Sequence, residues 1–568
     1  MVGIWNDVRY FWRQKCFAVG IPFMMILSYI TLLVNPTVGI DDTSFKLYYV
    51  DGVSPAMGRW CLYLMNKVLP LGYNPHFVEA VGLSVFCLSI TLWCVVFYRM
   101  FGKQISPGAY TIFGMVMLSS PILSEVVIWY LQDGIYLGYG FTALAVLFAM
   151  NSFRTEGPGS RKDRKWYRNK RLWGLLGASL LLVTALGFYE AFMIVFLMAM
   201  MMNFMLIRVL DKEEYSRKVR DWLINLLAIC IITMMFRTLI VGGITMMDHL
   251  EEQAKVLESR GLGDIFGLLA GWFDGTRDIG EFIYVLKDFF VKYYLHAIVY
   301  TPIMILVLAV GVLALWGMRY TVKKRDAWIL CSIAGIVFIP WIMPVLEGWA
   351  TYYRSSEYVP LLTAFAVLLM AWEIKDISRR SVRVGALLGV GVLLYWQGYE
   401  MNHWLYVDAR KYENDRVVMN AIALDILENC QEGKPICVIG SYGAPESLIS
   451  DVYVPEWSKK YELIRWLVSA VDEEIFEKYN VEGKGYATAE TPALSMIQWG
   501  TYAYGMPGSE LIKFWKMHGF SFAWDIQHRQ EALELMENGP AWPKKGSIVE
   551  MEDYIIVNLG DSGSKQNP

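Results

Sequence analysis

The sequence predicts a mostly α-helical polytopic membrane protein with its N-terminus inside, about eleven transmembrane helices and a C-terminal extracytoplasmic α/β domain. Two observations lead to this class. Hydrophobic residues make up 55% of the 568 residues and charged residues only 18%, against about 25% charged residues in soluble domains. The apolar residues gather in runs of about 20 residues, long enough to cross the ~30 Å core of a bilayer, and these runs end near residue 400. We therefore expect a membrane domain over 1–400 and a second domain over 401–568.

The apolar runs predict the spanning helices in order. The first run follows a basic N-terminal segment (Arg9, Arg13, Lys15), as in a secretory signal, but it reaches Pro36 without a small-residue cleavage site. We therefore expect it to be retained as a helix. The fifth and sixth runs meet at Glu190 and leave almost no loop. The runs cover 17–34, 77–98, 108–123, 135–152, 172–188, 190–207, 222–241, 295–317, 327–345, 358–374 and 384–399.

Lys and Arg residues are concentrated in every second loop between these runs. The segment 161–165 alone holds four cations, whereas the alternate loops hold few cations over longer stretches. Because cytoplasmic loops carry the excess of Lys and Arg, we expect the N-terminus inside and the loop after the first run outside. An odd number of spans then puts the C-terminal domain outside. The basic segments are the N-terminus, 99–103, 154–171, 208–220, 319–325 and 375–383.

The part of the chain beyond residue 401 has about ten more acidic than basic residues and no further apolar run. An amphipathic helix is predicted over 413–429, with an apolar face formed by Val417, Ala421, Leu424 and Leu427. The segments 435–440 and 548–557 predict a buried strand and a hairpin that turns at Glu552-Asp553. A further helical pattern covers 461–477, and the polar tail from 560 to 568 is expected to be disordered.

Several classes of site are excluded by the sequence. No Cys and His spacing matches a zinc site, no Walker or Rossmann glycine pattern is present, and no Lys/Arg-rich arm with interleaved aromatic residues indicates nucleic acid as a partner. Six of the eight Cys lie in or near the apolar runs, where Cys acts as a small apolar residue. Cys430 and Cys437 lie close together in the outer domain, and their spacing leaves a disulfide between them open.

Two carboxylates, Asp41 and Asp42, follow the first apolar run and are expected at the outer membrane surface. A carboxylate there can take a proton from an attacking hydroxyl, and Arg59, close behind in sequence, can stabilise a leaving phosphate. An enzyme that transfers a sugar from a lipid phosphate needs both groups near the headgroup plane. A structural alternative stands beside this hypothesis. In it the Asp pair caps a short helix that begins near Thr43, and Arg59 snorkels beside Trp60, an interface anchor.

Other polar residues are predicted near the outer surface and are candidates for the same site. Glu125 and Asp133 lie eight residues apart, on roughly one face if their segment is helical. Glu190 lies in the tight turn after the fifth run, and an acidic residue among apolar runs is expected to face a cavity rather than lipid. Arg237, toward the outer end of the seventh run, is either a phosphate contact or a snorkelling side chain. Arg354 is the only cation of the fifth outer loop.

Four short motifs follow one another along the chain: Ile40-Asp41-Asp42 with Gly58-Arg59-Trp60; Ser120-Pro121 with Glu125 and Asp133; Gly187-Phe188-Tyr189-Glu190-Ala191-Phe192; and the Tyr- and Asp-rich opening of 402–427. In this order and topology they resemble the GtrII-type bacterial membrane glucosyltransferases of the GT-C superfamily. The resemblance covers the membrane part and the start of the outer domain, and rests on the order of the motifs. The chain departs from the family at Glu190, because the family commonly has Gln after the Tyr.

The resemblance implies a GT-C-like multi-pass protein of the plasma or inner membrane. Such an enzyme takes a hexose, glucose by the family's name, from a polyprenyl-phosphate donor in the outer leaflet. It adds the sugar to a cell-surface polysaccharide or glycolipid, as in O-antigen modification. An acidic residue of the first outer loop, here Asp41 or Asp42, would be the general base. Some members of the superfamily need a divalent metal such as Mg²⁺ or Mn²⁺ and others do not, so the metal stays open. Our candidates for substrate binding are Arg59, Trp60, Glu125, Asp133, Tyr189, Glu190, Arg237 and Arg354.

Two other functions compete with this interpretation. A surface-polysaccharide polymerase or ligase performs related chemistry on the same side of the membrane, but such proteins tend to rely on Arg-rich outer loops, which this sequence lacks. A lipid-linked sugar transporter without chemistry is the second alternative. Transporters often show internal repeats and Gly- or Pro-broken helices in matching halves, and neither is evident in this sequence.

Overall fold

The computed structural model describes residues 2–39, 55, 58–68, 75–127, 134–154, 170–247, 280, 283, 286, 303–347, 355–375, 377, 379–442, 497 and 508–560. Several sequence-based predictions fall outside these residues. They are the predictions for Asp41, Asp42, Asp133 and Arg354, the helix over 461–477, and the tail beyond residue 560.

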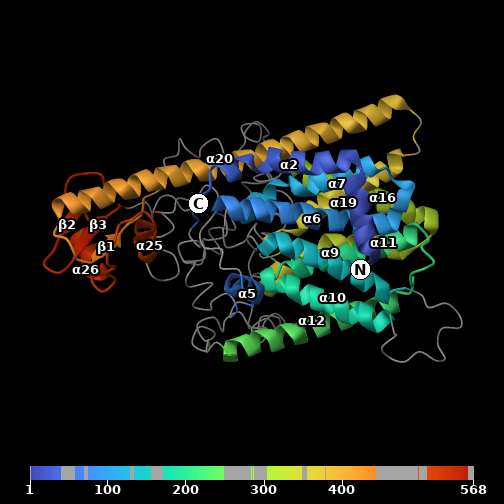
Figure 1. Cartoon of the computed structure of the whole chain (residues 1–568), viewed down its shortest axis with the longest axis horizontal. Coiled ribbons are helices and arrows are strands. Elements are labelled where there is room, and N and C mark those ends of the chain that lie inside the picture. Colours follow the sequence, from blue (N-terminus) through green and yellow to red (C-terminus); the bar gives the residue numbers. More distant parts are fainter. Residues whose placement is uncertain are drawn as a thin grey trace. The chain divides into compact units, whose positions relative to one another are not determined.

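Helices dominate the described part of the chain, and a small sheet lies near its C-terminus (Figure 1), which confirms the predicted fold class. The α-helices are α1 (Val2–Arg13), α2 (Lys15–Val34), α5 (Trp60–Val68), α6 (Pro75–Phe101), α7 (Pro107–Leu118), α8 (Ser124–Val127), α9 (Gly134–Ser152), α10 (Lys170–Phe188), α11 (Phe192–Val209), α12 (Val219–Met247), α16 (Ile303–Lys324), α17 (Ala327–Phe338), α18 (Ile342–Glu347), α19 (Tyr358–Ile374), α20 (Arg380–Asn429), α25 (Ser509–Met517) and α26 (Arg529–Leu535). Short 3₁₀ helices are η2 (Gly102–Gln104), η3 (Pro121–Leu123) and η8 (Ile339–Trp341), and the strands are β1 (Ile436–Ile439), β2 (Ile548–Glu550) and β3 (Ile555–Asn558).

Eight helices of the described residues are long and apolar enough to cross a membrane, so the chain is a multi-pass membrane protein. Two shorter apolar helices, Ala327–Trp341 and Tyr358–Ile374, accompany them. The run predicted over 295–317 is described from Ile303 and extends to Lys324, and the last predicted run, 384–399, forms the first part of α20. The eight are Lys15–Val34, His76–Gln104, Pro107–Val127, Gly134–Ser152, Arg171–Phe188, Phe192–Val209, Val219–Met247 and Leu306–Lys324.

The chain divides into two compact units. The first contains Met1–Ile30, Tyr48–Val126 and Gln132–Met401, and the second contains Thr31–Leu47, Val127–Leu131 and Asn402–Pro568. The division falls inside α20, a single helix of 50 residues. In the first unit α9 packs against α6 and α10, α7 packs against α19, and α16 packs against α17 and α19.

Residues 413–429 are helical and the helix ends at Asn429, as predicted, but the predicted start at residue 413 is wrong, because α20 continues without a break from Arg380. No Gly or Pro interrupts the chain between 399 and 429, so nothing ends the helix there. The predicted apolar face is also wrong. Val417 and Leu424 are 67% and 53% exposed. The buried stripe of this helix is instead formed by Val418, Ile422 and Ile426. The sequence carries apolar residues on both stripes, and periodicity alone does not choose between them.

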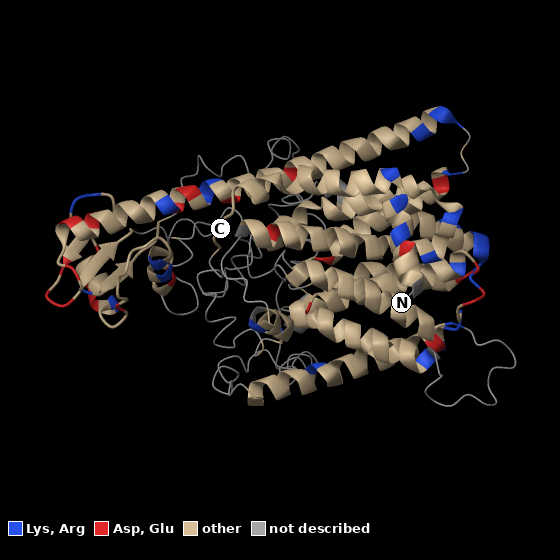
Figure 2. Ribbon diagram, viewed as in Figure 1, with Lys and Arg blue, Asp and Glu red and all other residues tan. Residues whose placement is uncertain are grey.

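Lys and Arg side chains gather at one end of the helices of the first unit (Figure 2). At this basic end Arg208 donates two hydrogen bonds of 2.6 and 2.8 Å to Asp326, and the two side chains are only 11% and 10% exposed. Asp326 also caps α17 by accepting a bond of 3.1 Å from the backbone N–H of Trp328. Nearby, Asp211 pairs with Lys324. These pairs fix the connection between α11 and α12 to the turn between α16 and α17.

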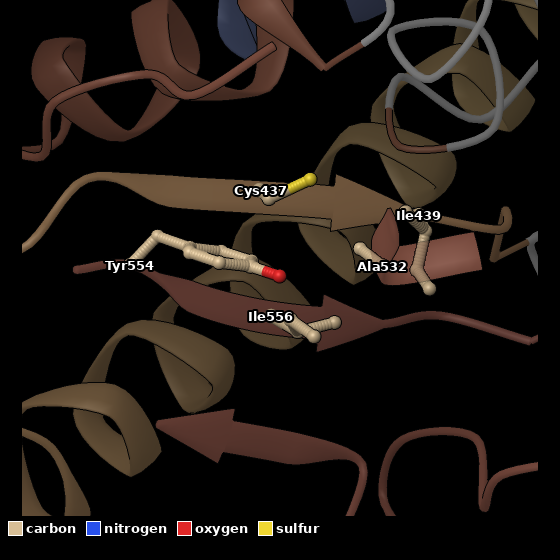
Figure 3. Packing of buried hydrophobic residues seen from close by; sticks show 5 residues of the cluster. All are labelled: Cys437, Ile439, Ala532, Tyr554 and Ile556. Carbon is tan, nitrogen blue, oxygen red and sulfur yellow. The ribbon is translucent and has the colours of Figure 1, made fainter. Parts of the chain in front are cut away.

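The second unit contains a mixed three-stranded sheet with the order β1-β3-β2, in which β3 is parallel to β1 and antiparallel to β2. The strand predicted at 435–440 and the hairpin predicted at 548–557 are therefore confirmed. A buried cluster packs on this sheet (Figure 3) and consists of Cys437, Ile439, Ala532, Tyr554 and Ile556. The thiols of Cys430 and Cys437 are both free. Burial raises the pKa of the Cys437 thiol to about 11, so this thiol is protonated at neutral pH.

An acid–histidine pair lies at the edge of β1. Asp525 follows a segment that runs beside this strand, and its backbone N–H donates to the carbonyl of Ile436 at 3.0 Å. The Asp525 Oδ2 lies 2.7 Å from His528 Nδ1, and the imidazole stacks on Tyr554 with ring centroids 4.3 Å apart. The hydrogen bond to Asp525 raises the pKa of His528. Partial burial would raise the pKa of Asp525, but its bonds from His528 lower it.

We expect Asp326→Asn to destabilise the protein by about 3 kcal/mol, because it leaves the buried Arg208 charge without its partner while Asn can still cap α17. The measurement is the thermal midpoint of the full-length protein in detergent. Asp211→Asn is the matched control, since this carboxylate is 49% exposed and an exposed pair contributes about 1 kcal/mol or less. An equal fall of the thermal midpoint in the two variants would contradict the role of Asp326 as the partner of the buried Arg208 charge.

We expect the Asp525–His528 pair to stabilise its unit most between about pH 4 and pH 6.5. The raised pKa of His528 contributes stability that is present below the unfolded value of 6.5 and lost as pH rises through the folded pKa. The lowered pKa of Asp525 contributes stability that is present above the unfolded value of 3.8 and lost as pH falls. Hydrogen exchange of peptides covering α26 in wild type and His528→Gln checks this. A difference between the two proteins that is the same at pH 6 and pH 9 would refute it.

Candidate functional site

The turn between α10 and α11 carries the first two residues of the candidate site, Tyr189 and Glu190. α10 ends at Phe188 and α11 begins at Phe192, so the prediction of almost no loop is confirmed. The backbone N–H of Tyr189 still donates to Ala185 at 3.1 Å, and the carbonyl of Glu190 already accepts from Met193 at 3.1 Å. The turn is therefore held at both sides by the two helices. It places a carboxylate, 41% exposed, at the end of two apolar spans.

Arg59 pairs with this carboxylate. Its Nη2 lies 3.2 Å from Oε1 of Glu190 and its Nε lies 3.4 Å from Oε2, so the guanidinium meets both carboxylate oxygens. The same guanidinium lies over the ring of Tyr189, 4.6 Å from its centroid, a favourable cation–π geometry. The Arg59 side chain is 16% exposed. Salt bridge and ring contact together fix the orientation of this guanidinium.

Arg237 of α12 reaches the same place from another direction. Gly58 has a φ of +87°, and a Cβ atom built on it would lie 2.1 Å from Nη2 of Arg237. Only glycine therefore allows this guanidinium to lie against the backbone that leads into Arg59. Burial by itself would raise the pKa of Glu190, but the nearby guanidinium groups of Arg59 and Arg237 outweigh it and hold that pKa below its usual value. Glu190 is ionised at neutral pH. We call Arg59, Glu190 and Arg237 the arginine–glutamate cluster.

Helix α5 positions Arg59 by packing against the end of α10 (Figure 1). Trp60 and Cys61 lie directly on Gly187, where a Cβ atom would come within 2.7 Å of either side chain. The Cys61 thiol donates to the carbonyl of Thr184 at 3.4 Å. Trp60 thus packs on α10, and the interpretation of this residue as an interface anchor does not describe its contact. A small residue at 187 brings α5 close enough for Arg59 to reach Glu190.

A third segment reaches the site through Tyr189. The Tyr189 hydroxyl lies 3.0 Å from the hydroxyl of Ser355, the residue that follows Arg354 in the sequence. Two residues further on, the carbonyl of Glu357 accepts a 2.7 Å bond from the hydroxyl of Tyr139 in α9. Ser355 and Tyr139 were not among the predicted site residues. The position of Ser355 next to Arg354 was the only signal for it, and Tyr139 lies unmarked inside an apolar run.

Four of the predicted residues, Arg59, Tyr189, Glu190 and Arg237, come together in this place. Glu125 is 2% exposed in the short helix α8. Asp41, Asp42, Asp133 and Arg354 fall outside the described residues. Within the described part of the chain, no group of three or more His, Cys, Asp or Glu side chains is arranged to hold a metal ion.

The cluster is suited to bind an anion. The guanidinium of Arg59 pairs with the Glu190 carboxylate and that of Arg237 lies against Gly58, and planar guanidinium forks match both carboxylate and phosphate oxygens. Because the Glu190 side chain is 41% exposed, the carboxylate is accessible from solvent. An anion that approaches the cluster can therefore share the two guanidinium groups with it.

Comparison with known proteins places most of the membrane part in one family. A model of the family described as Glucosyl transferase GtrII matches residues 30–371, which is more than half of the 568 residues. The matched stretch contains the whole arginine–glutamate cluster. No curated protein and no solved structure matches the chain.

We expect Gly58→Ala to destabilise the protein at least as much as Gly102→Ala. Both glycines have positive φ, +87° and +62°, so both variants carry a backbone strain of about 1–2 kcal/mol. At Gly102 a Cβ atom meets nothing within 4 Å, whereas at Gly58 it must displace the guanidinium of Arg237. The comparison is made by thermal midpoints in detergent. A smaller loss in Gly58→Ala than in Gly102→Ala would contradict the contact between Arg237 and Gly58.

Proposed function

Because this chain belongs to the GtrII family of glucosyl transferases, we propose that it moves glucose from a polyprenyl-phosphate carrier to a polysaccharide or glycolipid at the outer face of the cell membrane. Glucosyl transfer follows from the family. The donor, the acceptor, the side of the membrane and the catalytic residues are the proposal. The observation that carries it is the arginine–glutamate cluster at the end of apolar helices.

The cluster supports a lipid-phosphate donor. Arg59 and Arg237 bring two fixed positive charges to the end of the spans that contains the 189–191 turn. The phosphate of a lipid-linked sugar lies at this depth of a bilayer, with its chain in the hydrocarbon. Guanidinium groups held ready at this level can bind the donor phosphate and stabilise the charge that develops on it as the sugar leaves.

The distribution of charge supports the outer face. Lys and Arg gather at one end of the helices of the first unit (Figure 2), and cytoplasmic ends carry this excess. α10 begins at Lys170 and α11 ends with Arg208 in its last turn, whereas Glu190 lies in the turn that joins their other ends. The cluster is thus on the side opposite the basic end, which supports a site in the outer leaflet.

The proposed reaction needs a base for the acceptor. The acceptor hydroxyl attacks the anomeric carbon, its proton passes to a carboxylate, and the bond between that carbon and the phosphate oxygen breaks, with the electron pair going to the phosphate. Asp41 or Asp42 supplies the carboxylate in this proposal. They precede Arg59 in the chain by fewer than twenty residues, so the segment that ends in the phosphate-binding Arg59 also carries the acids.

We expect one of Asp41→Asn and Asp42→Asn to lower glucosyl transfer by about 10²-fold or more, the usual effect of losing a general base. Arg59→Gln and Arg237→Gln should each lower kcat/KM by about 10²-fold through loss of charge stabilisation. The assay follows labelled glucose from polyprenyl-phosphate glucose into glycan in membrane vesicles.

Asp211→Asn, at the basic end, is the control and should keep most of its activity. Full activity in both Asp41 and Asp42 variants would remove the proposed base. Transfer of a whole glycan instead of a single glucose would favour the polymerase or ligase alternative. Movement of the lipid-linked sugar across the membrane without transfer would favour the transporter.

A further inference from the structure

We propose that Glu190 governs release of the spent carrier. Its negative charge repels the doubly charged phosphate product more than the singly charged donor. The cluster therefore binds the product less tightly, relative to the donor, than two arginines alone would. The inference rests on the proposed donor. Glu190 is a charge-balancing residue in this scheme and does not itself react.

The reaction changes the charge of the group that the cluster holds. A polyprenyl-phosphate sugar is a phosphodiester with one negative charge. When the bond between the anomeric carbon and the phosphate oxygen breaks, the electron pair stays on that oxygen, and the carrier becomes a phosphate monoester. Such a monoester carries a charge of about −1.5 to −2 at pH 7, because its second pKa is about 6. Two guanidinium groups that stabilise this charge also bind the product more tightly than the donor.

Glu190 is placed to oppose this tight binding. Its carboxylate meets Arg59 at 3.2 and 3.4 Å, longer than the roughly 2.7–2.9 Å of a strong charge-assisted bond. The guanidinium of Arg237 acts on the same carboxylate. A phosphate that shares these two cations must therefore lie near a fixed negative charge. The repulsion grows with the charge of the ligand, so it is greater for the product than for the donor.

The effect of Glu190 on the difference between product and donor binding is independent of the other charges near the site. Replacing Glu190 by Gln adds one unit of positive charge at a fixed place. If this improves binding of a singly charged ligand by some factor, it improves binding of a doubly charged ligand by about the square of that factor. One unit charge at roughly 6 Å from another, at a partly solvated site, corresponds to about tenfold in affinity. The ratio of product inhibition constant to donor KM should then fall by about tenfold.

The test uses the full-length protein in nanodiscs of phosphatidylcholine, with polyprenyl-phosphate glucose as donor and polyprenyl phosphate as inhibitor. For wild type, Glu190→Gln and Glu190→Asp we would measure the donor KM and the inhibition constant of polyprenyl phosphate at pH 7.5. The expected result is a ratio about tenfold lower in Glu190→Gln. In Glu190→Asp, which keeps the charge, the ratio should stay within about threefold of wild type.

A second variant guards against misfolding of Glu190→Gln. Arg237→Gln removes one positive charge from the cluster, so it should weaken product inhibition more than it raises the donor KM and move the ratio upward. An unchanged ratio in Glu190→Gln, or equal falls in Glu190→Gln and Glu190→Asp, overturns the role of Glu190, as does an unchanged ratio in Arg237→Gln. Absence of transfer from polyprenyl-phosphate glucose by wild type overturns the proposed donor instead, and this inference with it.

Discussion

The ion pair of Arg59 with Glu190, with the guanidinium of Arg237 nearby, is the interaction on which the candidate site depends. Arg59 comes from the segment before α5, Glu190 from the turn after α10 and Arg237 from the middle of α12. Without the acid, two like charges would repel each other at the end of an apolar bundle. Without the arginines, an acid at that depth would favour its neutral form. The two arginines therefore keep the carboxylate ionised, and the carboxylate offsets the repulsion between them. Helix packing brings the three side chains together.

The two ends of the first unit use ion pairs in different ways. At the basic end the pair of Arg208 and Asp326 is about 90% buried and joins two helix connections, so its role is to hold the bundle. At the other end Glu190 keeps 41% of its exposure and meets Arg59 over longer distances. A closed pair with short bonds resists exchange with solvent ions, whereas an open and longer pair can admit a third charged group. This contrast separates structural from functional charge within one bundle.

Much of the fold could be predicted from the sequence. Runs of apolar residues indicate spanning helices, and β-branched segments bounded by Gly, Pro or other turn residues indicate strands. Glu190 stood out as an acid between two apolar runs, and Arg59 as a cation after the first. Their pairing could not be foreseen, since they are 131 residues apart and only the packing of Trp60 on Gly187 brings them together. The parallel pairing of β1 with β3 is likewise non-local. On α20 the apolar stripe of Val418 and the stripe of Val417 were equivalent by periodicity, and only tertiary contacts distinguish them.

Helix α12 gives the cluster a connection to the lipid itself. It is 29 residues long, about 44 Å at 1.5 Å per residue, which exceeds the ~30 Å hydrocarbon core. Its most apolar window is only 17% buried within the protein, and its buried residues, Trp222, Asn225, Ile229 and Thr233, all precede Arg237. A long helix held mainly at its first half adapts to bilayer thickness by tilting. Such tilting would change the distance of Arg237 from Gly58 and Glu190, so we expect lipid chain length to affect how well the site is assembled.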